Sequence, residues 1–310
     1  MLGKTANDLF WMSRYVERAD NTCRLIDTAQ YLNLTRGNNT SNQWKSLVQA
    51  SGMLSGFSEY YDSWNKENVI EWMLRSKKNN SSVFSIISNA RQNARLVRTA
   101  ITPEVWEAIN STYIFLNDNL KKKMNDDFVI KTLKRVKSMS LNYQGATDRT
   151  MLHNQILNFI NLGTFIERAD NTARILDVKY YVLLPSINSN VVDNIQWDLI
   201  LRSMSARGGY RLLYGHKINS ENITKFMILD KRMPRSLLFC IQNVKENLEL
   251  LRTSYNESQE LLNKVRHIET YLVHDISSIF KYGLHEFIQK IIQLNSELTL
   301  QIEEEYRFYQ

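Results

Sequence analysis

The sequence is poor in the residues that break helices or crosslink chains. Its 310 residues include only 3 prolines, 10 glycines and 2 cysteines. So little glycine and proline leaves few tight turns and predicts an all-α protein built from long helices. Cys23 and Cys240 both fall within helical patterns, which indicates free thiols in a reducing cytosol rather than a disulfide framework.

Long apolar runs are missing as well. No stretch approaches the roughly 18 uninterrupted apolar residues that a membrane span needs, so we expect no membrane partner. The charged residues Lys4, Asp8 and Arg14 come too early for the apolar region of a signal peptide, and the predicted location is therefore the cytoplasm. Apolar residues make up 43% of the chain, enough for the core of a single domain covering residues 1–310.

Basic residues are in excess, with a formal net charge of +7. Much of this excess lies in one polar region, which contains Lys121, Lys122 and Lys123 and four more basic residues between positions 131 and 137. Apart from Phe128, no aromatic residues lie within this run, whereas a surface that stacks nucleic-acid bases would have several. We interpret the run as a solvated surface and expect no nucleic-acid partner.

One charged segment occurs twice in the chain. Residues 17–27 read ERADNTCRLID and residues 167–177 read ERADNTARILD, identical at eight of eleven positions and 150 residues apart. Such self-similarity indicates an internal duplication. We predict a duplicated helical bundle with two pseudo-symmetric halves of long antiparallel helices, and repeats at about 1–140 and 145–310.

Both copies form a helix with two faces at about 100° per residue. Apolar residues such as Val16 and Ala19 share one stripe, and charged residues share the opposite face. There Asp20 and Arg24 stand four residues apart with the acid first, the favourable order for an ion pair. A solvated surface is the simplest reading. Because the duplication kept these residues, we instead predict a shared interior or cleft that binds a ligand or partner through Arg14, Glu17, Arg18, Asp20, Asn21, Arg24, Glu167, Arg168, Asp170, Asn171 and Arg174.

Helix boundaries follow from caps and breakers. We expect helices at about 5–34, from 41, at 68–75, from a cap at Ser81 or Ser82 to 98, and at 128–141, with a last helix at 278–306. Thr102, Pro103 and Glu104 signal a helix start, because proline fits the first helical position and an acid suits the positive end of the helix dipole.

The sequence lacks the signatures of several kinds of catalytic site. A di-metal bundle needs a Glu-x-x-His pair, which the five histidines do not form, so we predict no metal and no cofactor. Glu17 and Glu167 each have an arginine beside them and should stay ionised. Ionised glutamates suit an ammonium or guanidinium ligand, and the neighbouring arginines suit a carboxylate or phosphate. This chemistry fits zwitterions or peptides, or an ion-pair lattice between the repeats.

Several segments resemble the bacterial alpha-E domain family. The opening segment 7–27 reads NDLFWMSRYVERADNTCRLID, and the second half contains LGTFIERADNTARILD at 162–177, SMSARGGYR at 203–211 and MILDKRMPRSLLFCI at 227–241. The resemblance covers nearly the whole chain and implies an all-helical protein. One departure is Thr164, which stands where the pattern suggests an arginine, as at Arg14.

The resemblance also implies a functional context. Members of this family are typically encoded beside a circularly permuted ATP-grasp ligase and a transglutaminase-like protein. We therefore expect an accessory or partner component of an amide-ligase system, whose charged face recognises a peptide, an amino acid or the partner enzyme. The alternatives are a stand-alone enzyme acting on amide or acyl bonds through Glu17 and Glu167, and a purely structural scaffold. If the face is a binding site, Glu17→Gln should abolish function with little loss of stability, and Glu167→Gln should act more mildly.

Overall fold

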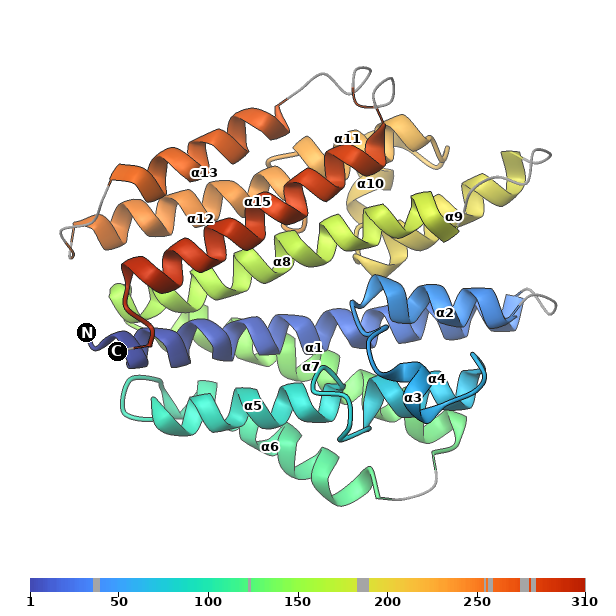
Figure 1. The fold of residues 1–310 in the computed structure, drawn as a ribbon, viewed down its shortest axis with the longest axis horizontal. Coiled ribbons are helices and arrows are strands. Elements are labelled where there is room, and N and C mark those ends of the chain that lie inside the picture. Colours follow the sequence, from blue (N-terminus) through green and yellow to red (C-terminus); the bar gives the residue numbers. More distant parts are fainter. Residues whose placement is uncertain are drawn as a thin grey trace. The chain divides into compact units, whose positions relative to one another are not determined.

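All regular elements that the structure describes are α-helices, which confirms the all-α class (Figure 1). The computed structural model describes residues 1–35, 40–121, 124–182, 190–253, 255, 259–273, 279 and 283–309. The polar cluster at 36–39 and most of the predicted start of the last helix, at 278–282, lie outside these residues. No helix in the described part of the chain is both long and apolar enough to cross a bilayer.

The chain divides into two compact units. Unit 1 contains Met1–Thr164 together with Phe308–Gln310, and unit 2 contains Phe165–Arg307. The helix α8, Gln155–Val182, begins in unit 1 and continues into unit 2. The boundary falls three residues before Arg168, so the two copies of the charged segment belong to different units. The prediction of a single domain with repeats meeting near 140–145 stays a prediction.

Unit 1 is built around four long helices. Helix α1 packs against α5 and α7, and α6 packs against the same two helices, so the four close into a ring. Side-chain pairs show that neighbours run antiparallel: Asp27 and Glu17 of α1 contact Lys137 and Gln144 of α7 respectively. Three shorter helices complete the unit. In chain order, the elements are α1 (Gly3–Thr35), α2 (Thr40–Ala50), α3 (Phe57–Tyr60), α4 (Lys66–Leu74), α5 (Val83–Leu96), α6 (Pro103–Asn119) and α7 (Asp126–Thr150).

The local start signals are confirmed in this unit with two differences. Ser82 caps α5 by accepting a hydrogen bond from the Ser85 backbone N–H, and Pro103 opens α6 as predicted. Thr102 does not cap α6 with its side chain; its hydroxyl instead lies 2.7 Å from that of Thr150. Helix α7 continues nine residues past the predicted end at Leu141, through Gly145, and ends at Thr150 beside Thr102.

A close helix contact joins the start of α8 to α1 within unit 1. A Cβ atom on Gly163 would lie only 2.1 Å from the Phe10 carbonyl oxygen and 2.3 Å from the Ser13 hydroxyl oxygen. Both distances are far below any tolerable contact, so only glycine permits this approach of the two backbones. Phe10 and Phe159 both pack on the Phe308 ring beside this contact.

Unit 2 has the same kind of framework. Phe165 of α8 packs on Phe239 of α12, and α12 packs on α13, which packs on α15. Helix α15 returns to α8 through the Asn295 amide, which donates to the Ile166 carbonyl oxygen. After α8, the described elements are α9 (Asn190–Ser203), α10 (Arg207–Tyr214), α11 (Ser220–Leu229), α12 (Leu237–Arg252), α13 (Gln259–Leu272) and α15 (Leu284–Glu305).

The two units share local details at nearly constant spacing. Asn65 and Asn219 cap α4 and α11, and Ser82 and Ser236 cap α5 and α12, both pairs 154 residues apart. Helices α2 and α9 also end alike, 153 residues apart. At each of these two helix ends, one residue has a left-handed backbone conformation: Gly52 in unit 1 (φ 71°) and Ser205 in unit 2 (φ 51°). In both, this residue and the next donate to carbonyls three and five residues back, the Schellman arrangement.

Glycine at position 205 should therefore make the folded protein more stable than serine does. A serine in the left-handed region is strained by its Cβ, and glycine is not. We expect Ser205→Gly to raise the free energy of unfolding by roughly 0.5–1 kcal/mol. The matched change Gly52→Ser should lower it by a similar amount. Urea denaturation followed by circular dichroism measures both, and a loss of stability in Ser205→Gly would contradict the strain.

Glu269 of α13 predicts a pH dependence of the α12–α13 contact. It accepts hydrogen bonds from Gln242 (2.9 Å) and Lys245 (3.0 Å) of α12. The Gln242 hydrogen bond, followed by Lys245, lowers the pKa of Glu269 below its ordinary value of 4.5. A lowered pKa stabilises the fold above the ordinary value, and this contribution disappears as pH falls through the lowered value. We expect Glu269→Gln to cost about 0.5–1 kcal/mol at neutral pH. In urea denaturation series, the difference from the native chain should shrink as pH falls below 4.5 and through the lowered pKa of Glu269. A pH-independent difference would contradict this assignment.

Candidate functional site

The predicted site residues lie on two helices, six on α1 in unit 1 and five on α8 in unit 2. Helix α1 is continuous because residues 4–35 contain neither glycine nor proline. Both its faces are buried: Val16 and Ala19 on the apolar side, and Glu17 and Asp20, at 1% and 0% exposure, on the charged side. The prediction that the charged residues of the two helices share one interior or cleft stays a prediction.

In unit 1 the charged side of α1 faces α7. The Gln144 amide donates a hydrogen bond to the Glu17 carboxylate (Nε2 to Oε2, 3.2 Å). Ten residues further along α1, the Lys137 ammonium lies 2.9 Å from the Asp27 carboxylate. Because both carboxylates accept bonds from the neighbouring helix, this side of α1 is used to hold the bundle together.

In unit 2 the same side of α8 faces α15 and the start of α12. Asp177 receives bonds from His285 (2.5 Å) and Gln289 (2.7 Å) of α15. Arg168 donates to the Pro234 carbonyl oxygen at 3.3 Å, and the Thr172 hydroxyl donates to that of Arg235 at 2.8 Å. The last two contacts fix the segment that leads into α12. Glu167, the residue before Arg168, is also buried, at 1% exposure.

The predicted ion pairs form in both copies. Arg24 Nε lies 2.7 Å from Asp20, and Arg174 Nε lies 2.6 Å from Asp170. The pair in α1 is the more buried, since the Arg24 side chain is 15% exposed and that of Arg174 is 38% exposed. Partial burial strengthens such pairs relative to pairs on an open surface.

The two copies differ at the position before the Glu-Arg pair, as expected from Thr164. The Arg14 guanidinium carbon lies 4.5 Å from the centre of the Trp11 ring, a cation–π contact. The Thr164 hydroxyl instead donates to the Ile160 carbonyl oxygen of its own helix at 3.0 Å. The second copy therefore lacks the basic group and the ring contact that the first copy has at this place.

The buried polar residues next to these pairs show no reactive group. Cys23 is fully buried, and desolvation raises the pKa of its thiol, which keeps it in the unreactive protonated form. Cys23 and Cys240 are both free thiols. Asn21 and Asn171 are buried at matched positions, and no described residue bonds the Asn171 side-chain nitrogen. Among described residues, no cluster of three or more His, Cys, Asp or Glu side chains is arranged to hold a metal ion.

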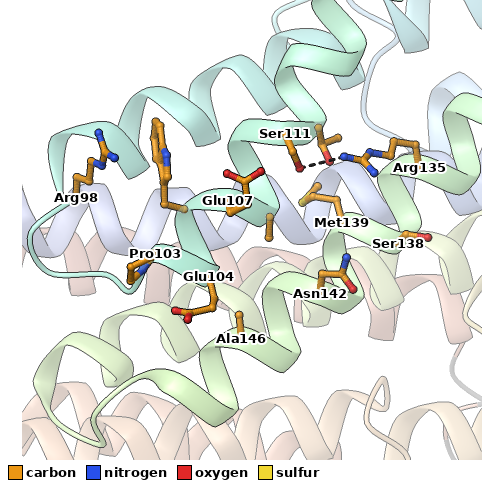
Figure 2. A pocket seen from close by; sticks show the side chains of 13 residues that line it. Arg98, Pro103, Glu104, Glu107, Ser111, Arg135, Ser138, Met139, Asn142 and Ala146 are labelled. Carbon is orange, nitrogen blue, oxygen red and sulfur yellow. Dashed lines mark hydrogen bonds between the residues drawn. The ribbon is translucent and has the colours of Figure 1, made fainter.

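A second candidate site lies in unit 1, where sequence reasoning did not place one. It is an open groove of about 690 Å³ between α6 and α7 (Figure 2). Glu104, Glu107 and Ser111 lie on α6 at helical spacing. This spacing is the feature of the sequence that could have indicated a polar wall on this helix. The opposite wall comes from α7, and the full lining is Arg98, Pro103, Glu104, Trp106, Glu107, Ala108, Ser111, Thr112, Arg135, Ser138, Met139, Asn142 and Ala146.

Unit 2 has a groove of about 750 Å³ between α13 and α15. Its charge is different, because acidic residues dominate and one of them, Glu297, lies 3.8 Å from Lys264. The lining consists of Glu260, Lys264, Glu297, Leu300, Gln301, Glu304, Glu305 and Arg307. The two grooves therefore present different chemistry to a ligand.

Comparison with known proteins identifies the family. Residues 1–306 match the model of the Alpha-E family, described as a predicted alpha-helical domain with a conserved ER motif. The chain belongs to the Alpha-E family. The dipeptide Glu-Arg occurs at 17–18 and at 167–168, so this Alpha-E chain carries the motif at the start of both charged segments.

The curated relatives of this Alpha-E chain are longer proteins. An uncharacterized protein of Mycobacterium bovis is 21% identical over 274 residues, which is 83% of this chain and 30% of that protein. Uncharacterized proteins from two strains of Mycobacterium tuberculosis match over the same lengths with 21% and 20% identity. The chain thus spans about a third of the length of the curated relatives it matches. No solved structure matches it.

The contacts of Glu17 lead to a prediction for the Glu-Arg pair. Removing one charge from a buried lattice leaves its partners unpaired, so Glu17→Gln should cost on the order of 3 kcal/mol in unfolding free energy. The control is Asp126→Asn, the same chemical change in an exposed pair with Lys66, where the Asp126 side chain is 68% exposed. It should cost less than about 0.5 kcal/mol. Thermal and urea unfolding measure both.

The opposite result would support the prediction that the charged face is a binding site. If Glu17→Gln has the same free energy of unfolding as the native chain but loses partner or ligand binding, the carboxylate recognises a ligand and does not mainly stabilise the bundle.

Proposed function

We propose that this chain is an accessory component of an amide-ligase system that works with a circularly permuted ATP-grasp ligase. The observation that carries the proposal is the length of its relatives. In each of them the matching region is 30% of a longer polypeptide, so this region is covalently joined to further protein. A domain joined to other segments in relatives acts together with them, which supports a component over a self-sufficient enzyme.

We further propose that the two units are copies of one ancestral helical unit. The support is the repeated local chemistry: matched ion pairs 150 residues apart, matched left-handed helix ends 153 apart and matched helix caps 154 apart. Unrelated bundles have no reason to place the same caps at the same spacing. The slow drift of the offset fits small insertions in loops, where they cost little.

On this proposal, the main role of the charged side of each copy is to stabilise the packing of helices within its unit. Contacts within one unit support this role, to α7 from Glu17 and Asp27 and to α15 from Asp177. Burial at 1% exposure leaves a substrate no direct access to Glu17 or Glu167, which favours an accessory role over catalysis by these glutamates. In the second copy, the Arg174 side chain is 38% exposed and therefore partly open to solvent.

Co-purification with a circularly permuted ATP-grasp ligase from the same organism tests the proposal. We expect the tagged chain to retain the ligase on an affinity column, and to increase amide formation in an ATP-consumption assay. A variant with reversed charge at the exposed Arg174, Arg174→Glu, keeps the buried glutamates and tests whether this edge contributes.

Turnover of an amide or acyl substrate by the purified chain alone would overturn the proposal if Glu17→Gln abolished that turnover while the protein stayed folded. Failure of the two proteins to associate would do the same.

A further inference from the structure

The groove between α6 and α7 of unit 1 contains opposite charges that do not pair with each other. Arg98, Arg135, Glu104 and Glu107 all line it. None of these four side chains forms an ion pair with any residue that the structure describes. Oppositely charged groups within one cavity normally pair, so this arrangement leaves both signs available to a ligand.

The two arginines are held in place by neutral partners. The Arg135 guanidinium donates to the Ser111 hydroxyl (Nη2 to Oγ, 3.0 Å), shown as the dashed line in Figure 2. The Arg98 guanidinium carbon lies 5.0 Å from the centre of the Trp106 ring. A neutral hydrogen bond and a ring contact orient a guanidinium without cancelling its charge, so its remaining N–H groups can bind a carboxylate.

Along the groove, Glu104 lies at one end and Arg135 at the other, with Arg98 toward the Glu104 end and Glu107 between the two ends (Figure 2). Helices α6 and α7 run antiparallel, so Glu104 lies near Ala146 at one end and Ser111 lies near Arg135 at the other (Figure 2). Seven residues of helix separate Glu104 from Ser111, a distance of about 10.5 Å along the axis. An extended peptide covers about 3.3 Å per residue, so three residues span this distance.

The middle of the groove suits a peptide backbone. Asn142 of α7 is exposed and lines the groove between its ends, where its amide can both donate and accept. Met139 and Thr112 are buried, at 2% and 1% exposure, and form the floor. A volume of about 690 Å³ falls in the range of small-ligand sites.

We propose that this groove binds a short zwitterionic peptide of about three residues, with its ammonium at Glu104 and Glu107 and its carboxylate at Arg135. The inference rests on the proposed function for its biological context, since it names the ligand class of the same amide-ligase component. Direct binding to the purified chain, without any ligase, tests it separately, so its failure leaves the co-purification result unaffected.

The experiment compares three forms of trialanine by calorimetry or by chemical shifts of the labelled full chain. We expect the peptide with free termini to bind, and the N-acetylated and C-amidated forms to bind at least tenfold more weakly. In Arg135→Gln, the free and the amidated peptide should bind equally, because the group that reads the carboxylate is gone. In the double variant Glu104→Gln, Glu107→Gln, the free and the acetylated peptide should bind equally.

Two controls keep the result specific. Lys134→Gln changes an exposed neighbour on α7 that does not line the groove, and it should leave all three affinities unchanged. Ser111→Ala removes only the hydrogen bond that orients Arg135 and should weaken the free and acetylated forms but not the amidated one. The proposal is wrong if free trialanine does not bind at millimolar concentration, if blocked peptides bind as well as the free one, or if Lys134→Gln weakens binding equally.

Discussion

Hydrogen bonds and ion pairs between the long helix of each unit and its last helix are the contacts on which the rest of the structure depends. In unit 1 they join Glu17 to Gln144 and Asp27 to Lys137. In unit 2, Asp177 receives bonds from His285 and Gln289. A carboxylate as buried as that of Glu17 is costly unless it is bonded, so these contacts fix which helix faces which and in what register. Apolar contacts alone would allow the helices to slide.

The remaining geometry follows from backbone chemistry at the helix ends. Caps at Ser82 and Ser236 start the second helix of each ring, and left-handed residues at Gly52 and Ser205 end α2 and α9. These positions set the length of each helix and therefore which side chains meet across the ring. Gly163 adds one contact that no other residue permits, because α8 approaches the α1 backbone too closely for a Cβ atom.

Buried and exposed charged residues have different roles in this protein. A binding role for one set can therefore coexist with a structural role for the other. In the two Glu-Arg segments, Glu17 and Arg168 are buried and hydrogen-bonded to neighbouring segments of their own units. The groove between α6 and α7 keeps its charges unpaired at the surface. Since the bundle is rigidified by the first set, the second set is held at a defined separation, as recognition of a small zwitterion requires.

Local sequence was enough to predict the helical class, most helix starts, the Asp20–Arg24 ion pair and the difference between Arg14 and Thr164, because each depends on composition or on residues within one helix. It did not determine the partners Gln144, Lys137, His285 and Gln289, which lie more than 100 residues away and meet the charged segments only after the ring closes. It also missed the groove, since a cavity between α6 and α7 exists only when two helices pack, and a single helix pattern cannot say which exposed charges will face each other. The extent of α7 past Leu141 was likewise decided by packing, because its last turns have weak helix signals and are held by contacts such as that between Thr150 and Thr102.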